Sequence, residues 1–230
     1  MVPAEILFVE GSTFRQWLRE LEQDPDVKHT LAGQSEAQVA ALVGVQGGSL
    51  EGWLFPDTYR FSPGSSDLEI LRRAHAAMAR RLDEAWAARD PDVPLATAYE
   101  ALILASIVEK ETGVAEERPL VASVFANRLR KGMRLQTDPT VIYGMGERYD
   151  GNIRKKDLTE DTPWNTYTRD GLPPTPIAMP GEEALHAALH PAHSEFLYFV
   201  ARGDGSHEFS RTLEEHNRAV ARYQLHRAAS

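Results

Sequence analysis

Two glutamates in the segment ILASIVEKETG, Glu109 and Glu111, have a spacing that suggests acid–base chemistry. At about 100° per residue, a helix would place Glu111 on the apolar face that includes Ile107. Glu109 would lie about 200° further round the axis, so we expect it to be solvated. Apolar neighbours raise the pKa of a carboxyl group, which then keeps a proton near neutral pH. The pattern predicts Glu111 as a general acid. The spacing is equally compatible with a structural role, in which Glu111 simply ends the helix beside a Lys or Arg.

Polar groups suited to sugar hydroxyls follow in MRLQTDPTVIYGMG and recur in the NTYT and GLPPTP segments. Neutral polyols are bound by planar polar side chains, which reach the hydroxyls, and by aromatic faces, which cover the C–H surface. The predicted sugar-binding residues are Gln136, Thr137, Asp138, Tyr143, Asn165 and Tyr167. Asp138 also has a structural alternative, because an Asp-Pro pair is a common turn former whose carboxylate binds local backbone amides.

The histidines raise the question of a metal site. His186, His190 and His193 are spaced so that two imidazoles could share one helical face. However, no HExxH motif is present and no carboxylate is clearly placed as a third ligand, so we expect neither a metal nor a cofactor. His207 and His216 are isolated in the sequence. The absence of GxSxG, Walker-type and dinucleotide-binding patterns disfavours serine esterases, nucleotide hydrolases and dehydrogenases.

Three strongly periodic helices are expected to position these residues, at 67–88, 97–112 and 117–131. The shorter expected elements are a strand at 6–9, a helix capped by Ser12 or Thr13, a helix at 34–43, an extended segment at 58–61, a helix at 182–189, a strand at 196–201 and a final helix from 212. Between 133 and 181 periodicity nearly vanishes, and irregular runs of this length in compact domains are usually functional. We therefore expect an α+β fold: a single, mainly helical catalytic domain with short strands, in which this irregular segment forms the cleft.

Composition narrows the class of protein. The 230 residues are enough for one large domain or two small ones, and 42% hydrophobic with 26% charged residues is typical of a soluble globular protein. The formal net charge of −9 argues against nucleic acid as a partner. No cysteine is present, which excludes disulfides and a thiol nucleophile. The apolar stretch at 101–108 is far shorter than the roughly 20 residues that span a bilayer, and the opening MVPAEILFVEG does not read as a signal peptide.

Several longer segments together carry a family resemblance: EGWLFPDTYRF, ASIVEKETG, LQTDPTVIYG, NTYTRDGLPPTPIAMPG, HPAHSEFLYFVA and HEFSRTLEEHN. They closely resemble the bacterial endolytic murein transglycosylases, the YceG-like or MltG family, over nearly the whole chain from Val9 to Tyr223. The resemblance implies an enzyme at the periplasmic face of the inner membrane that cuts nascent peptidoglycan strands internally and works with peptidoglycan synthases. Family members usually begin with a membrane-spanning helix and a LysM-like module. Both are missing here, so we expect residues 1–230 to be the catalytic domain of a longer parent protein.

The resemblance also implies a mechanism. The family's catalytic glutamate is the second Glu of the Glu-Lys-Glu motif, which is Glu111 here. By that analogy one carboxyl group protonates the glycosidic oxygen between N-acetylmuramic acid and N-acetylglucosamine and then accepts the proton of the muramic C6 hydroxyl, giving a 1,6-anhydro end. Three alternatives stay open: lysozyme-like hydrolysis, a non-catalytic module that binds peptidoglycan or its synthases, and a zinc hydrolase.

Overall fold

A small antiparallel sheet opens the fold in the computed structural model, which describes residues 2–225. Strand β1 (Ala4–Leu7) pairs with β2 (Thr58–Phe61), with Ala4 opposite Phe61. The extended segment predicted at 58–61 is confirmed. The strand predicted at 6–9 is wrong by two residues, because the chain leaves the ladder after Phe8 and turns through Gly11, whose φ of 75° suits glycine, into the first helix.

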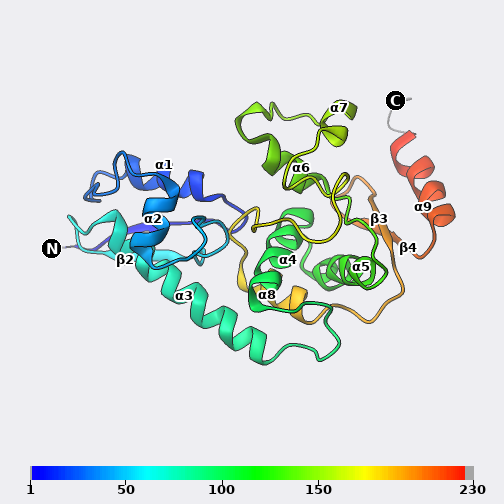
Figure 1. Ribbon diagram of the computed structural model, residues 1–230, viewed down its shortest axis with the longest axis horizontal. Coiled ribbons are helices and arrows are strands. Elements are labelled where there is room, and N and C mark those ends of the chain that lie inside the picture. The colour runs from blue at the N-terminus through cyan, green and yellow to red at the C-terminus, as the bar shows by residue number, and fades with distance from the viewer. Residues whose placement is uncertain (1, 226–230) are drawn as a thin grey trace.

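Two capped helices cover this sheet in Figure 1. Helix α1 (Phe14–Gln23) begins with a capping box in which Thr13 is the N-cap, and α2 (Glu36–Val43) begins with an equivalent box. The Trp17 ring is fully buried and stacks on Phe8 with ring centroids 3.7 Å apart. Together with the start of α3 (Asp67–Ala87), these elements enclose the first of two buried apolar clusters.

The second apolar cluster lies around α4 (Ala98–Glu111). Helices α5 (Arg118–Arg130) and α8 (Glu182–Leu189) pack against α4, and the turn η1 (Ala115–Glu117) contacts α5. Figure 1 shows α3 running diagonally from the first cluster towards the second. Every residue from 101 to 108 is buried, so α4 is surrounded by protein on all sides. Trp53 packs against both clusters and joins them. The three long helices were predicted to within one residue at each end.

The segment from 133 to 181 is more ordered than its sequence indicates. It contains α6 (Asp138–Met145), the turn η2 (Gly146–Arg148) and α7 (Lys155–Thr159), so the expectation of an irregular run is wrong at these positions. Pro139 stands in the first turn of α6, where a missing N–H costs nothing. Glycine normally indicates a break in a helix, yet Gly144 lies inside α6. A larger residue would not fit there, because an added Cβ would lie 2.4 Å from Thr162 Oγ1.

The last part of the chain adds a hairpin and a helix at one end of the molecule (Figure 1). Strand β3 (Tyr198–Ala201) pairs antiparallel with β4 (His207–Ser210), and α9 (Leu213–Val220) with the π-helical turn η3 (Ala221–Leu225) follows. The predicted strand at 196–201 starts two residues too early, because Leu197 N–H already bonds to Ser210 outside the regular ladder. Helices and short strands together confirm the α+β class.

Candidate active site

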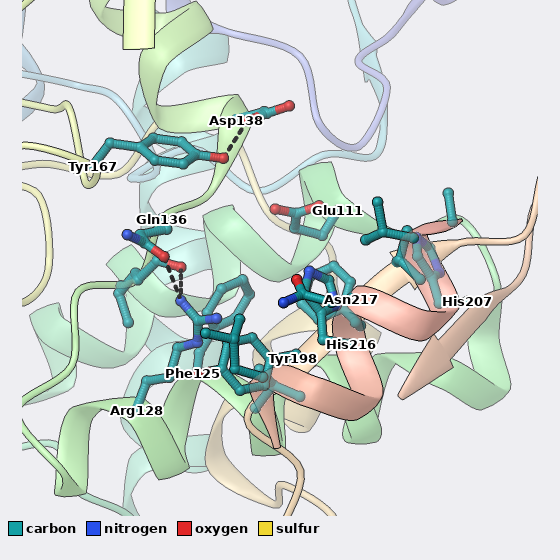
Figure 2. A pocket seen from close by; sticks show the side chains of 17 residues that line it. Glu111, Phe125, Arg128, Gln136, Asp138, Tyr167, Tyr198, His207, His216 and Asn217 are labelled. Carbon is teal, nitrogen blue, oxygen red and sulfur yellow. Dashed lines mark hydrogen bonds between the residues drawn. The ribbon is translucent and has the colours of Figure 1, made fainter. Parts of the chain in front are cut away.

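Glu111 is the last residue of α4, and its side chain lines a cavity of about 530 Å³. The helix is fixed at its start by Thr97, whose hydroxyl accepts the N–H of Glu100, and its middle is buried throughout. The cavity walls come from α5, the segment before α6, the hairpin β3–β4 and α9, all of which surround Glu111 in Figure 2. The apolar helix therefore delivers one half-buried carboxyl group into a partly polar space.

The surroundings of Glu111 change its acidity. The pKa of its carboxyl group is raised to about 7. Burial and the charge of Asp138 raise this pKa, and a hydrogen bond from the Thr137 hydroxyl to Oε1 lowers it. Desolvation is the largest of these effects because the charged form loses its hydration. A carboxyl group of this kind is partly protonated at neutral pH, which is the property a general acid needs.

Thr137 is held in place by a small network of hydroxyl groups. Its side chain is 2% exposed, and its backbone N–H donates to Thr166 Oγ1 at 3.0 Å. The hydroxyl of Thr140 donates to the carbonyl of Thr137 at 2.7 Å and lies 2.8 Å from Thr166 Oγ1. Thr137, predicted as a sugar ligand, does not line the cavity, and its hydroxyl donates a hydrogen bond to the Glu111 carboxyl group instead.

Three other predicted sugar-binding residues do line the cavity: Gln136, Asp138 and Tyr167. The Tyr167 hydroxyl donates to Asp138 Oδ1 at 2.6 Å, so the ring and the carboxylate form one unit. Gln136 is the one non-glycine residue with a positive φ, 51°, among those the structure describes. That backbone conformation leaves its amide exposed at the cavity while its N–H donates to Thr166 O at 3.2 Å.

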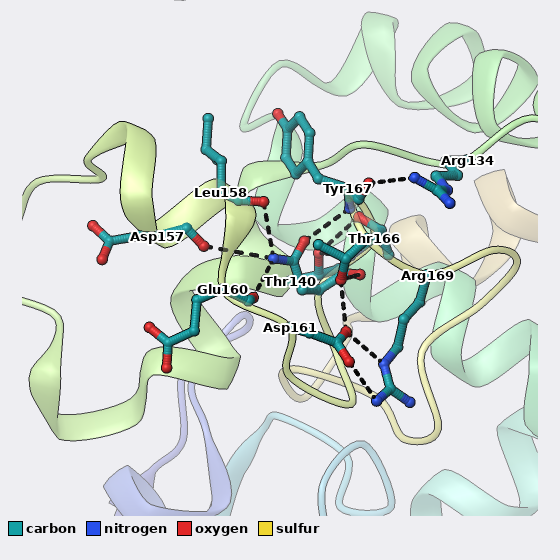
Figure 3. Close-up of polar contacts among 11 residues, drawn as sticks. Arg134, Thr140, Asp157, Leu158, Glu160, Asp161, Thr166, Tyr167 and Arg169 are labelled. Atoms are coloured by element: carbon teal, nitrogen blue, oxygen red, sulfur yellow. Dashed lines mark hydrogen bonds and ion pairs between the residues drawn. The ribbon is translucent and has the colours of Figure 1, made fainter.

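Asn165, which was predicted to bind sugar, does not line the cavity of Glu111. The side chain is fully buried, and Nδ2 donates to the carbonyls of Leu158 and Glu160 at 3.1 and 2.7 Å and to that of Asp157 at 3.5 Å (Figure 3). Its Oδ1 accepts the N–H of Tyr167 at 2.8 Å. All its polar atoms are used inside the protein, so Asn165 fastens the segment that carries Tyr167.

Tyr143 also lies outside the cavity. Its hydroxyl donates to Oε2 of Glu51 at 3.0 Å, and its ring packs edge-on against Trp164. Glu51 is 3% exposed, and its Oε1 accepts the N–H of Phe14 at 3.0 Å. Burial raises the pKa of Glu51 to about 8. The predicted sugar ligand thus connects α6 to the start of α1 through a buried carboxyl group.

Glu109 is not the solvated carboxylate that the helical pattern predicts. It is half-buried, its Oε2 accepts the N–H of Gly181 at 2.8 Å, and burial raises its pKa. The chain before α8 passes α4 at this point. The residue pattern of a single helix cannot predict a contact with such a distant segment. Glu109 does not line the cavity of Glu111.

Five residues of the cavity with polar side chains were not predicted as site residues: Arg128, Tyr198, His207, His216 and Asn217. Among them, His207 is held firmly, because Glu117 accepts both its backbone N–H at 2.9 Å and its Nδ1 at 2.7 Å. These residues come from α5, β3, β4 and α9. No spacing in the sequence connects them, since only the packing of the C-terminal hairpin brings them to Glu111.

Two of the histidines considered as metal ligands, His186 and His190, have structural partners. His190 Nδ1 lies 2.9 Å from Asp90 Oδ1, and its ring stacks on His186. Within residues 2–225, no group of three or more His, Asp or Glu side chains is arranged to hold a metal ion. None of the helices in this described part is both long and apolar enough to cross a membrane.

Comparison with known proteins places this chain in a family. The model of the YceG-like family matches residues 2–222. An endolytic murein transglycosylase of Bacillus subtilis (strain 168) is 41% identical over 174 residues, which are 76% of this chain and 48% of that protein. One from Streptococcus pneumoniae (strain D39) is 33% identical over 180 residues, covering 76% and 32%. The chain thus spans about half or less of the length of these curated relatives.

A solved structure agrees with the sequence comparison. The crystal structure of a yceG-like protein from Listeria monocytogenes is similar to this chain with a TM-score of 0.80 and 34% sequence identity, covering 95% of this chain and 76% of that one. Because the family model and the fold both extend over nearly the whole described chain, the protein belongs to the YceG-like family.

Proposed function

We propose that this chain is the catalytic domain of an endolytic peptidoglycan lytic transglycosylase that uses Glu111 as its single acid and base. The observation that carries the proposal is the Glu111 carboxyl group, which lies in a 530 Å³ cavity with its pKa raised to about 7. The names of the relatives from Bacillus subtilis and Streptococcus pneumoniae support the same activity.

The proposed reaction needs one proton that is given and then taken back. Glu111 protonates the oxygen between N-acetylmuramic acid and N-acetylglucosamine, and the bond from muramic C1 to that oxygen breaks. The C6 hydroxyl of the same muramic residue then attacks C1 and returns its proton to Glu111, so that a C1–O6 bond closes the 1,6-anhydro ring. No water is consumed, and the carboxyl group ends in its starting state.

Three residues are proposed to hold the sugar. The exposed amide of Gln136 and the paired Asp138 and Tyr167 line the cavity, and they offer donors, acceptors and a ring face to a polyol. Thr137 is proposed to orient Glu111 instead of touching substrate. The substrate class is peptidoglycan strands, and the parent protein is proposed to act at the periplasmic face of the inner membrane beside peptidoglycan synthases.

Hydrolysis is the second candidate, and Asp138 is the observation that favours it. A second carboxylate in the same cavity is the arrangement that hydrolytic glycosidases use to activate water or to attack the sugar. In this chain, however, Asp138 accepts a hydrogen bond from Tyr167, which occupies one of its oxygens. The products distinguish the two candidates, because a hydrolysed end is heavier than an anhydro end by one water.

The test is product analysis by mass spectrometry after digestion of purified glycan strands. We expect internal cuts with anhydro ends from the wild-type chain and none from Glu111→Gln, with unchanged circular dichroism. Glu109→Gln is the matched control, since it removes a carboxylate from the same helix without touching the cavity, and it should keep its activity. Full activity of Glu111→Gln, or binding without any cleavage by the wild-type chain, contradicts the proposal.

A further inference from the structure

Arg128 lines the same cavity as Glu111 with a buried charge that has no acidic partner. The residue is 7% exposed. Its Nε donates to Leu197 O at 2.7 Å, and its Nη1 donates to Arg134 O at 2.9 Å and Leu135 O at 3.1 Å, with Gln136 Oε1 at 3.5 Å. All of these acceptors are neutral. Within residues 2–225 the guanidinium forms no ion pair, and its Nη2 donates no hydrogen bond.

An unpaired buried cation is unusual in a folded protein. Taking a charge out of water costs free energy that neutral acceptors only partly return, and such charges are normally paired. A guanidinium cannot escape the cost by losing its proton at neutral pH. The Tyr198 ring, 5.0 Å from the guanidinium carbon, offsets part of it. Nη2 has no hydrogen-bond partner in the described part of the chain, but it is not one of the fully buried polar atoms. It is therefore accessible to a ligand in the cavity that Arg128 lines.

The surroundings of Arg128 form one continuous wall, which we name the Arg128 wall: Arg128, Tyr198, His216 and Asn217. His216 stacks on Tyr198 with ring centroids 5.1 Å apart. Burial, together with the charge of Arg128, lowers the pKa of His216, so this ring is neutral near pH 7 and Arg128 supplies the charge of the wall. The exposed amide of Asn217 adds a donor at its edge.

The negative charge of the cavity lies on another side. In the view of Figure 2, Asp138 and Tyr167 lie on one side of Glu111, and Arg128 and Tyr198 lie on the other. An anionic group on a ligand would be repelled by Asp138 and attracted by Arg128. The cavity can therefore orient a substrate that carries one negative charge at a fixed distance from the bond to be cut.

We propose that the Arg128 wall is a subsite for a carboxylate group of the substrate. The inference rests on the proposed function, in which the substrate contains muramic acid. That sugar carries a lactyl ether whose carboxyl group is either free or joined to a peptide that itself bears carboxylates. Both sources present the same chemistry, and a guanidinium with a free Nη2 can bind either through a charge-assisted hydrogen bond.

The proposal is tested by binding measurements that do not need cleavage. The Glu111→Gln protein is titrated by calorimetry with three glycan oligomers of equal length: one with free lactyl carboxylates, one with these groups converted to methylamides, and one with intact stem peptides. We expect about tenfold or more tighter binding for a carboxylate form than for the methylamide form. Preference for the free lactyl form or for the peptide form identifies the source, and equal affinities for all three overturn the subsite.

Variants separate a binding role from a structural one. Arg128→Gln should bring the affinity ratio between carboxylate and methylamide oligomers to about one, whereas a purely structural role would weaken all oligomers alike. Because Arg128→Gln removes several buried hydrogen bonds, Asn217→Asp is the second test. It adds a negative charge to the exposed edge of the wall and should weaken the carboxylate forms alone. An unchanged ratio in Asn217→Asp overturns the placement at this wall.

A control variant checks the measurement, and failure of the subsite can be distinguished from failure of the proposed function. Arg169→Gln removes an exposed arginine that is paired with Asp161 outside the cavity, and it should leave the ratio unchanged. Normal cleavage by the wild-type chain combined with equal affinities contradicts the subsite and leaves the proposed function intact. Absence of anhydro-ended product contradicts the proposed function, while the affinity ratio can still be measured.

Discussion

The hydroxyl of Thr137 donates a hydrogen bond to Oε1 of Glu111, so the N-cap of α6 touches the last residue of α4. This bond stabilises the ionised carboxylate and lowers the pKa of Glu111, against the larger effect of burial, which raises it. The protonation state of Glu111 therefore depends on a contact between two helices that are 26 residues apart at this point.

Thr137→Val should shift the pH dependence of the reaction. In the wild-type chain the protonated acid is lost as pH rises through about 7, so activity should fall across that range. Removing the hydroxyl removes an effect that lowers the pKa, and the alkaline fall should move upward by about half to one pH unit. The rate of anhydro-product release between about pH 5 and about pH 9 measures it.

Thr140→Val is the matched control for that shift. It removes a fully buried hydroxyl from the same network, which bonds to Thr137 O and lies beside Thr166 Oγ1, without a contact to Glu111. We expect a loss of about 1–2 kcal/mol in unfolding free energy and no displacement of the alkaline fall. If both variants moved the pH profile equally, the direct Thr137 contact would not be the cause.

Glu51→Gln should change how stability depends on pH. Burial raises the pKa of Glu51 from 4.5 to about 8, so between these values the folded state holds a proton that the unfolded state has released. Stability from this group is fully present below about pH 4.5 and is lost as pH rises through about 8. The glutamine variant should lack this loss and gain a few kcal/mol relative to wild type near pH 9.

Urea unfolding at several pH values from about 5 to about 9 tests the prediction, with Glu5→Gln as the control. Glu5 is an exposed glutamate on β1 that pairs with Arg60 at the surface, so its substitution removes a carboxylate without touching the buried contacts of Glu51. Parallel curves for wild type and Glu51→Gln would show that the Glu51 carboxyl group is already ionised in the folded protein.

The parts of the site that one helix determines could be predicted from the sequence. The apolar neighbours of Glu111 at helical spacing, among them Ile107, predicted a carboxyl group in apolar surroundings at the end of α4, and these neighbours are buried in the structure. Glu109 was misjudged by the same reasoning, since its surroundings come from Gly181 on a distant segment. Helical periodicity describes one element and says nothing of what packs against it.

The remaining walls depend on tertiary packing. Helix α6 escaped prediction because it has eight residues and contains both Pro139 and Gly144, which act here through position and close approach. Arg128 lies on a helix that was predicted well. The cavity that it lines exists only because the C-terminal hairpin packs beside this helix and forms another wall. A polar residue such as Asn165 looks equally suited to bind sugar or backbone until the carbonyls around it are known.

Asn165 offers a direct test of that distinction. Asn165→Ala should lower the unfolding free energy by about 2–3 kcal/mol, because the backbone carbonyls that accept hydrogen bonds from Nδ2 lose their donor. Asn165→Asp should cost more, since it places a carboxylate against the same carbonyl oxygens. Denaturant unfolding of both variants measures the effect. A rise in KM at unchanged stability would instead indicate the sugar-binding role that the sequence suggested.

Gln136 combines a strained backbone with a side chain at the cavity, and two substitutions separate these properties. A positive φ of 51° is unfavourable for glutamine by about 1 kcal/mol and free of strain for glycine. Gln136→Gly should therefore keep or raise stability while it weakens glycan binding, because the amide is lost. Asparagine tolerates the same φ and retains an amide, so Gln136→Asn should keep more of the affinity.

The two measurements must be made on the same preparations, with denaturant unfolding for stability and calorimetry with glycan oligomers for affinity. Tighter or unchanged binding by Gln136→Gly would mean that the exposed amide does not contact the sugar. In that case the left-handed backbone at Gln136 serves only to turn the chain, so that the next residue, Thr137, reaches Glu111. The order of affinities, glutamine above asparagine above glycine, is the result that supports a direct contact.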